Sequence, residues 1–389
     1  MKVLLTSRLY PSSAYPARGT FVHNQARFLS ELCEVEVLAP LPYFPRIPGF
    51  GRWSALAGVA DVEERDGLSV QYPRYFSPPR RLLFARAWRA YLRALEDGAA
   101  LRPRPDVLHA HLAYPDGRAA VEYGARLGIP VVISVHGHDV REIPQANPRW
   151  RTLVAEALTR ADAVVASSRD VRTRVLELGV APQRIWDIPQ GVDCARFAPP
   201  VVRRGGKGGW RLLYAGRFDA KKGIAVLLDA LHLLCQHRGD VSLKLVGASS
   251  DSGNGEAFRQ QAERLGLAER VEFCPARPWS EMPTVMAEPD VFVLPSFYDS
   301  FGIVLIEAMA CGVPVVATRC GGPEQLVDDG VGRLAEVGDA ASLAAAIEDV
   351  LTHYADFEPD TLRRRAEAFD YRQVAERTLA LYESVLKKS

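Results

Sequence analysis

Two acidic side chains belong to a predicted helix in the second half of the chain, one just before its start and one inside it. Asp299 and Glu307 are eight residues apart, a little over two helical turns, so they fall near one face of a helix predicted over Phe301–Met309. A carboxylate such as Glu307 can accept hydrogen bonds from two neighbouring hydroxyls, as on a ribose. The mouth of a helix, where Asp299 would lie, favours anions and hydrogen-bond acceptors. The alternative is that Asp299 only caps the helix and that Glu307 is solvated.

Two cations follow another predicted strand. Arg217 and Lys222 lie in the stretch 214–223, directly after the strand predicted over Leu212–Ala215. A guanidinium binds phosphate bidentately and an ammonium acts as a point charge, so the pair suits a diphosphate. A solvated turn is the alternative here. The loop Thr318–Glu324 contains paired glycines, which allow a close backbone approach to the same sheet edge.

Histidines gather around one turn of the first half. His136, His138 and Asp139 follow the strand predicted over Val131–Val135, and the pair His109 and His111 lies earlier in the chain. A His-x-His pair can ligate a metal, but no Cys or Glu at suitable spacing completes a ligand set. The sequence also offers no DxD motif, since Asp328 and Asp329 lie in a hydrophilic turn. We therefore expect no metal and no cofactor.

Short apolar runs alternate with helical patterns along the whole chain. The pattern predicts parallel βαβ units with helices on both faces of the sheet, an α/β fold. Strands are predicted over Val3–Thr6, Val35–Ala39, Val107–Ala110, Val131–Val135, Ala163–Ala166, Ile185–Ile188, Leu212–Ala215, Ser242–Val246, Val271–Phe273, Val291–Leu294 and Val315–Ala317. Helices are predicted over Phe21–Leu32, Leu82–Leu95, Gly117–Leu127 and Asp170–Leu178.

The alternation breaks once, at a Pro-rich and then Gly-rich stretch. This break predicts an N-terminal domain over 1–198, a linker over 199–209 and a C-terminal domain over 210–368. Two doubly wound domains would face a central cleft, and such sheets bind ligands at the carboxyl ends of their strands. The amphipathic segment 369–389 is predicted to be a helix that crosses back to the first domain, because its apolar stripe needs a partner.

Composition excludes several classes of protein. Of 389 residues, 48% are hydrophobic and 24% charged, the balance of a folded globular chain. The formal net charge of +1 gives no overall polyanion signature, so no nucleic-acid partner is expected. No apolar run reaches the ~18 residues of a membrane span, and Arg8 interrupts any signal peptide. Six cysteines without a CxxC pair suit reduced thiols and a cytoplasmic location.

Taken together, these motifs resemble the GT-B-fold retaining glycosyltransferases of family 4. The resemblance spans nearly the whole chain and rests on the GRxxxxKG stretch at 216–223, the stretch 299–318, the glycine pair at 321–322 and Ile188–Asp193. It implies two Rossmann-like domains. Gln190 replaces the Asn of the family's PNGVD turn, and Asp299 occupies a position where the family normally has Glu, so its reach is about one methylene shorter.

The resemblance also assigns roles to the site residues. It implies that His136, Arg217, Lys222 and Asp299 act at the reaction centre, with His136 reaching the donor sugar. Donor binding is assigned to Gly19, Gly216, Phe301, Gly302, Ile303, Val304 and Glu307. Gly19 is the counterpart of paired glycines that the family normally places against the diphosphate.

The implied reaction moves a sugar from a nucleotide diphosphate, such as a UDP- or GDP-sugar, to a hydroxyl with the anomeric configuration retained. Attack occurs on the face that the diphosphate leaves, and the leaving phosphate helps to deprotonate the acceptor. A sugar-nucleotide epimerase and a non-catalytic nucleotide-sugar binder remain as alternatives. A phosphorylase would need a cofactor lysine that we do not find. A Rossmann oxidoreductase would need GxGxxG after the first strand, and Thr6–Leu9 lacks it.

The acceptor side is less clear from the sequence. Residues 74–104 contain eight arginines against Glu96 and Asp97, interleaved with apolar and aromatic residues. Such a helix either lies on an anionic membrane or is an ordinary amphipathic helix with solvated arginines. The aromatic loop 42–50 could contact a lipid or sugar acceptor. The resemblance implies a glycan or lipid-linked acceptor in cell-surface polysaccharide or glycolipid synthesis, with peripheral contact at the inner face of the membrane left open.

Overall fold

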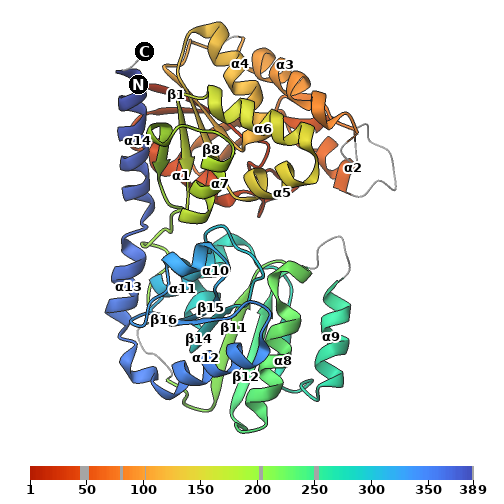
Figure 1. The fold of residues 1–389 in the computed structure, drawn as a ribbon, viewed down its shortest axis with the longest axis vertical. Helices are drawn as coiled ribbons and strands as arrows, with labels where there is room; N and C mark the ends of the chain where they lie inside the picture. The colour runs from red at the N-terminus through yellow and green to blue at the C-terminus, as the bar shows by residue number, and fades with distance from the viewer. Residues whose placement is uncertain (44–51, 79–81, 101, 201–204, 249–253, 388–389) are drawn as a thin grey trace. The chain divides into compact units, whose positions relative to one another are not determined.

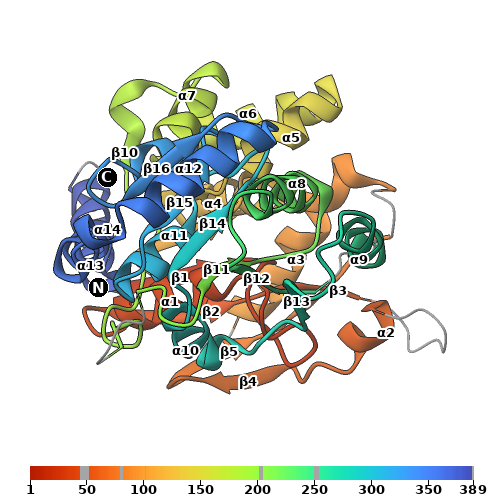
Figure 2. The ribbon, with the colours of Figure 1, turned by 90° about the horizontal axis from the view of Figure 1, so that it is seen from below.

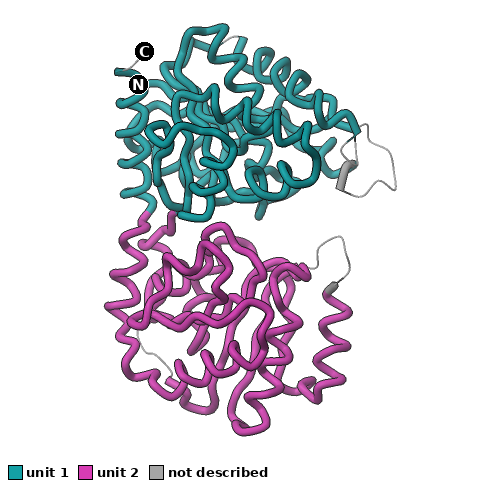
Figure 3. The backbone as a smooth tube through the Cα atoms, viewed as in Figure 1, with its two compact units in different colours: residues 1–190, 371–389 teal, residues 191–370 magenta. Residues whose placement is uncertain are grey.

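The chain folds into two compact units. The computed structural model describes residues 1–43, 52–78, 82–100, 102–200, 205–248 and 254–387. Unit 1 comprises Met1–Gln190 and Tyr371–Ser389, and unit 2 comprises Gly191–Asp370 (Figure 3). Each unit is built around its own sheet (Figure 1).

The sheet of unit 1 has eight strands in the order β10-β9-β8-β7-β1-β2-β5-β4. Its neighbours pair in parallel except β4 and β5, which are antiparallel. The strands are β1 (Lys2–Thr6), β2 (Glu34–Leu38), β4 (Val62–Arg65), β5 (Leu68–Gln71), β7 (Val107–His111), β8 (Val131–Val135), β9 (Ala163–Ala166) and β10 (Ile185–Asp187). A separate parallel pair is formed by β3 (Leu41–Tyr43) and β6 (Arg74–Phe76).

Helices cover both faces of this sheet. They are α1 (Thr20–Leu29), α2 (Arg52–Ala57), α3 (Ala87–Ala99), α4 (Arg118–Leu127), α5 (His138–Ala146), α6 (Pro148–Arg160), α7 (Arg169–Glu177) and α14 (Tyr371–Leu386). Because side chains alternate along a strand, Leu4 and Leu108 face one buried cluster and Val3 and Val107 face another. Leu381 of α14 packs in the second cluster, and α14 also packs against α1.

Unit 2 contains a six-stranded parallel sheet in the order β13-β12-β11-β14-β15-β16. The strands are β11 (Trp210–Ala215), β12 (Val241–Val246), β13 (Val271–Cys274), β14 (Val291–Leu294), β15 (Val315–Thr318) and β16 (Gly332–Ala335). Its helices are α8 (Ile224–Cys235), α9 (Asn254–Arg264), α10 (Met282–Ala287), α11 (Ile303–Ala310), α12 (Ala340–Thr352) and α13 (Pro359–Glu367). Figure 2 shows α8 and α12 on one face of the sheet and α10 on the other.

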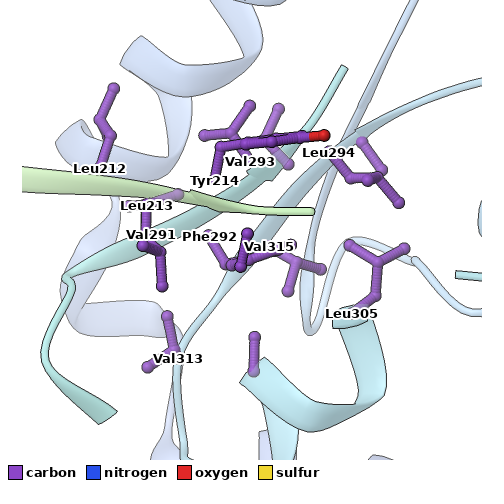
Figure 4. Close-up of a cluster of buried hydrophobic side chains, with 14 of the residues drawn as sticks. Leu212, Leu213, Tyr214, Val291, Phe292, Val293, Leu294, Leu305, Val313 and Val315 are labelled. Carbon is purple, nitrogen blue, oxygen red and sulfur yellow. The ribbon is translucent and has the colours of Figure 1, made fainter. Parts of the chain in front are cut away.

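The core of unit 2 is almost wholly apolar. Consecutive residues of β11 and β14 are buried, as parallel strands covered on both faces require. Figure 4 shows Leu212, Tyr214, Phe292 and Leu305 among the side chains packed around these two strands. Tyr214 contributes a polar group as well, since its hydroxyl donates to the carbonyl of Arg217 at 2.8 Å and so holds the loop that follows β11.

In both sheets, the apolar runs of the sequence predicted those strands that are covered on two faces. All eleven are present; three have the predicted ends, and the other eight have one or both ends displaced by one or two residues. The sequence analysis did not predict β3, β4, β5, β6 or β16. These strands are short and several alternate polar with apolar residues, as in Val62–Arg65, so they lack the continuous apolar signal of a central strand.

The boundary between the units falls earlier than the sequence predicted. The predicted N-terminal domain extends to residue 198, but Val192, Cys194 and Phe197 are buried in the core of unit 2. The Arg363 guanidinium fixes this segment by donating to the carbonyls of Cys194 and Phe197 at 2.9 and 3.2 Å. Residues 191–198 are therefore held in unit 2 by their buried apolar side chains and by the carbonyls that accept from Arg363.

The predicted linker is also held in place where it is described. Residues 201–204 lie outside the described chain, whereas Gly206 donates its N–H to the Asp290 carboxylate at 3.2 Å. The same carboxylate accepts from Arg211 N–H at 3.0 Å. Residues 205–209 thus form a turn attached to the start of β11, because one buried carboxylate holds both segments.

Other expectations concern cysteines and the membrane. All six cysteines are free thiols. Within the described ranges, no helix combines the length and the apolar character needed to cross a bilayer.

Candidate active site

The predicted cations and carboxylates of unit 2 lie where its sheet changes direction. From β11 the chain goes outward to β12 and β13, then returns to β14 on the other side and continues to β15 and β16. The loops that follow β11 and β14 therefore leave neighbouring strands in opposite directions, and open parallel sheets bind their ligands at such a point of the carboxyl edge. Gly216, Arg217 and Lys222 follow β11, and Asp299 follows β14.

Lys222 and Asp299 form an ion pair across this edge. The Lys222 Nζ lies 2.7 Å from Asp299 Oδ2, and both side chains are mostly buried. The other carboxylate oxygen, Oδ1, accepts the Phe301 N–H at 3.3 Å. Asp299 therefore lies just before the helix, accepts one backbone N–H and is paired with a cation, a partner that the sequence analysis did not predict.

Helix α11 begins at Ile303, two residues later than predicted, and presents unpaired amides. Its N-terminal neighbour Gly302 has φ 94°, which favours glycine and aims the chain into the helix. Within the described chain, the N–H groups of Ile303 and Val304 donate to no partner. A helix N-terminus with such amides suits an anion. Phe301, predicted to bind donor, is 2% exposed and its ring packs against Phe369, so only its backbone faces the site.

A close backbone approach fixes the loop ahead of α11. The N–H of Gly322 donates to the carbonyl of Asp299 at 2.8 Å. A Cβ atom on Gly322 would lie 2.3 Å from both the N and Cα atoms of Phe301, so only glycine fits. Glu324, in the same loop, accepts the Gly321 N–H at 3.1 Å. The loop with the glycine pair thus holds the main chain of Asp299 through the hydrogen bond from the Gly322 N–H.

Glu307 is the second carboxylate of α11. It is partly buried, and its carboxylate forms no hydrogen bond or ion pair with the part of the chain that the structure describes. Burial raises the pKa of this carboxyl to about 8. A ligand whose hydroxyls donate to this desolvated carboxyl would stabilise its ionised form.

Arg217 is the cation available at this edge. Its side chain is exposed and its guanidinium has no partner among the described residues. Gly216 donates its N–H to the Val246 carbonyl at 2.9 Å, which continues the sheet by one residue and fixes where Arg217 begins. Because Lys222 is neutralised by Asp299, the uncompensated positive charge here belongs to Arg217 and the α11 amides.

In unit 1, His136 follows β8 and is held by protein groups at both ring nitrogens. Its Nε2 lies 3.1 Å from His111 Nδ1, and its Nδ1 lies 3.1 Å from the Gln190 amide nitrogen. Burial lowers the pKa of His136 to about 4, and the Asp139 charge opposes this shift. His136 is therefore a neutral imidazole at physiological pH.

The neighbours of His136 have structural partners. Asp139 is fully buried and accepts the N–H groups of His136 and Ala113, both at 2.9 Å, so it joins two loops. His138 pairs with Glu142 at 3.3 Å. No cluster of His, Cys, Asp or Glu in the described residues has the arrangement of a metal site. Gly19 has φ 65° at the start of α1, and a Cβ there would lie 1.8 Å from the Leu9 carbonyl oxygen.

Sequence reasoning missed an ion pair at the corresponding edge of unit 1. Arg8 follows β1 and Asp116 follows β7, the two strands between which this sheet changes direction. Arg8 N–H donates to Asp116 Oδ1 at 2.7 Å, and its Nε lies 3.4 Å from Oδ2. Burial raises the pKa of Asp116 to about 6. The only sequence signal was the position of each residue directly beyond a strand end.

Comparisons with known proteins show the family to which this chain belongs. A model named "Glycosyltransferase Family 4" matches residues 19–196, and one named "Glycosyl transferases group 1" matches residues 204–368. A glycogen synthase of Mycobacterium tuberculosis is 30% identical over 98% of this chain and 94% of its own length. This chain belongs to the family 4 glycosyltransferases.

Other relatives of this glycosyltransferase match in part or in fold. The D-inositol 3-phosphate glycosyltransferase of Pseudarthrobacter chlorophenolicus is 33% identical, but the match spans 63% of this chain and 62% of that protein. Sucrose-phosphate synthase of Thermosynechococcus elongatus has a TM-score of 0.81 at 22% identity, covering 100% of both chains. Anabaena HepE in complex with UDP and glucose has a TM-score of 0.76 at 21% identity, covering 99% of this chain and 100% of its own. The fold is thus GT-B.

The close approach at Gly322 generates a stability prediction for the glycosyltransferase. Gly322→Ala should lower the free energy of unfolding by about 2 kcal/mol or more, because the new Cβ must displace the backbone of Phe301. Gly239→Ala is the matched control, since a Cβ there meets nothing within 4 Å. The measurement is urea unfolding of both variants. Equal stability of the two would show that the Gly322 loop yields without cost.

Proposed function

We propose that this protein is a retaining, metal-independent glycosyltransferase that moves a sugar from a UDP- or GDP-sugar to a hydroxyl acceptor. The observation that carries the proposal is the edge of unit 2. There, a guanidinium, two helix amides and a carboxyl follow adjacent strands, and none of them has a partner among the described residues. These groups match the diphosphate and the ribose of such a donor.

The diphosphate is the part of the donor that these groups suit best. Arg217 supplies a bidentate cation, and the amides of Ile303 and Val304 supply oriented N–H groups. Negative charge grows on the departing diphosphate in the transition state, so fixed donors at this place lower the barrier. Glu307 accepts hydrogen bonds from the ribose hydroxyls. Asp299, held against Lys222, is proposed to contact the sugar through its remaining lone pairs or through a water.

Retention is proposed to proceed by attack on the face that the diphosphate leaves. The acceptor oxygen bonds to the anomeric carbon as the bond from that carbon to the phosphate oxygen breaks, and the acceptor proton passes to the departing phosphate. The ion pair between Asp299 and Lys222 argues against a covalent sugar intermediate on Asp299, because that carboxylate is already engaged. Arg217 and Lys222 of unit 2, and His136 of unit 1 as the family resemblance implies, are proposed to act in the transfer.

The acceptor is proposed to be a glycan or a lipid-linked sugar in cell-surface polysaccharide or glycolipid synthesis, at the cytoplasmic side of the membrane. Exposed apolar side chains in unit 1 support a lipid surface nearby. Tyr43 and Phe76 are register neighbours on β3 and β6, and they are 56% and 63% exposed. Leu82 and Leu83, just before α3, are 63% and 56% exposed.

A row of arginines accompanies these apolar side chains. Arg86, Arg89 and Arg93 are exposed at spacings of three and four residues, so they share one face at α3, and they form no ion pair within the described residues. Arg74, Arg102 and Arg104 instead bind carbonyls or side chains of unit 1. Arg80, Arg81 and residues 44–50 lie outside the described chain. Charge and apolar exposure together favour an anionic bilayer over a solvated arginine face.

The main test of the function is the phosphate assignment. Arg217→Ala should lower transfer by about a hundredfold, a loss of ~3 kcal/mol in transition-state stabilisation. Lys222→Met should cost at least as much, because it leaves the Asp299 charge unpaired beside the diphosphate. Adding Asp299→Asn to Lys222→Met should recover part of the lost UDP or GDP affinity. Sugar transfer from a donor panel, with nucleotide affinity by thermal shift, is the measurement.

Three outcomes would contradict this assignment or the proposed function. Near-normal turnover in both single variants would show that the diphosphate does not bind at this edge. Loss of all activity in EDTA, with rescue by Mg²⁺ or Mn²⁺, would show that a metal carries the charge that we assign to protein groups. Donor consumption without any acceptor would indicate an epimerase or hydrolase.

Glu307 generates a pH prediction. Its pKa of about 8 means that the carboxyl is mostly neutral at pH 7, and hydroxyls donate best to the ionised form. Affinity for the nucleoside diphosphate should therefore rise with pH, by up to about eightfold from pH 7 to 8.5. Glu307→Gln should abolish this rise and bind with nearly constant affinity. A rise of equal size in Glu307→Gln would assign the titration to another group.

The membrane proposal is tested with vesicles of defined charge. The wild-type protein should co-sediment with phosphatidylglycerol vesicles in a salt-sensitive way and much less with phosphatidylcholine. Replacing Arg86, Arg89 and Arg93 by Gln should weaken partitioning by about a hundredfold, at ~1 kcal/mol for each charge. Leu176→Ser with Val337→Ser, two exposed apolar sites elsewhere, is the control. Equal partitioning of all three proteins would exclude this surface.

A further inference from the structure

A row of three histidines leads from the C-terminal helix to His136. His109 and His111 lie on β7, and His136 follows β8. His109 Nδ1 lies 2.6 Å from the Tyr382 hydroxyl of α14, and its Nε2 lies 2.8 Å from Ser134 Oγ. The rings of His109 and His111 lie face to face with centroids 4.5 Å apart. His109 thus supports the ring of His111 from one face.

His111 and His136 share a proton in the plane of their rings. The ring planes are 7° from parallel, and the nitrogens His111 Nδ1 and His136 Nε2 are 3.1 Å apart. Burial lowers the pKa of each of these two histidines, so both are neutral at physiological pH. A neutral imidazole has one N–H and one lone pair. The tautomer of one ring therefore dictates the tautomer of the other.

Gln190 completes the hydrogen bonding of His136. Its amide nitrogen lies 3.1 Å from His136 Nδ1, so the amide donates and Nδ1 accepts. His136 then carries its proton on Nε2 and donates to His111. Both hydrogen-bonding positions of the His136 ring are used inside unit 1, and a substrate would have to displace Gln190 to reach a ring nitrogen, because His111 is fully buried.

This tautomer is costly at His111. Once His111 accepts at Nδ1, its proton lies on Nε2, and that atom is buried with no hydrogen-bond partner in the described chain. The reversed pair of tautomers would leave a lone pair there instead of an N–H, and buried N–H groups without acceptors are the rarer case. The immediate surroundings of His111 therefore favour the reversed pair, and the amide N–H of Gln190 opposes it.

We propose that Gln190 is a positioning residue that fixes the Nε2–H tautomer of His136, and through it the tautomer of His111. The role rests on the proposed function only in that His136 belongs to the reaction centre. Gln190 is also the last residue of unit 1 before the chain passes into unit 2. A change in the backbone at this crossing would therefore act directly on the His136 ring.

The test observes the ring nitrogens directly by 15N NMR of the full-length protein, assigned with His136→Asn and His111→Asn. In the wild type, His136 should be protonated on Nε2. Q190E replaces the donor by a carboxylate that accepts, so the proton of His136 should move to Nδ1 and His111 should reverse with it. Q190L, which removes the donor without adding charge, should also reverse both rings.

The matched control is Y382F, which removes the hydroxyl from His109 and keeps the ring in α14. It should leave the tautomers of His136 and His111 unchanged, because His109 contacts His111 by ring faces and shares no proton with it. A wild-type His136 protonated on Nδ1, or unchanged tautomers in both Gln190 variants, would overturn the proposal. The spectra need no substrate, so loss of the proposed transfer activity would leave this test intact.

Discussion

The divergence of the chain at the centre of each parallel sheet is the constraint on which the candidate site depends. β11 and β14 send their following loops to opposite sides of the carboxyl edge. The amides at the start of α11 and the Arg217 guanidinium have no partner there among the residues that the structure describes. The same topology in unit 1 places Arg8 and Asp116 beyond β1 and β7, and there the two side chains form an ion pair.

The two edges therefore manage charge in different ways. In unit 2, Lys222 is paired with Asp299, and the partly buried Glu307 has no partner in the described chain, so desolvation raises its pKa. A carboxyl in such surroundings costs free energy until hydroxyls bind to it. In unit 1, burial keeps His109, His111 and His136 neutral. His136 is held by hydrogen bonds with Gln190, His111 and Asp139.

Glycines make the ligand-facing edge of unit 2 possible. Gly322 lets its loop bond to the Asp299 carbonyl, and Gly302 turns the chain into α11 with φ 94°. Gly223, with φ 69°, passes so close to the Pro295 carbonyl oxygen that a Cβ would lie 1.9 Å from it. Side chains at these positions would separate loops that come from three different strands. The main chain thus sets the spacing on which Lys222 and Asp299 depend.

The sequence by itself determined the central strands, the α/β class and the residues at the ends of the strands, because continuous apolar runs and glycine pairs are local signals. It also pointed to Asp299, Glu307, Arg217 and Lys222 as candidate site residues, since their spacing on one helix or one loop is local. Tertiary structure alone decided that Lys222 is paired with Asp299 and that Glu307 has no partner among the described residues. It likewise decided that residues 191–198 pack in unit 2, and that Tyr382, His109 and His111 stand behind His136. These facts join residues far apart in the chain, and burial and hydrogen-bond partners follow from packing that no local pattern records.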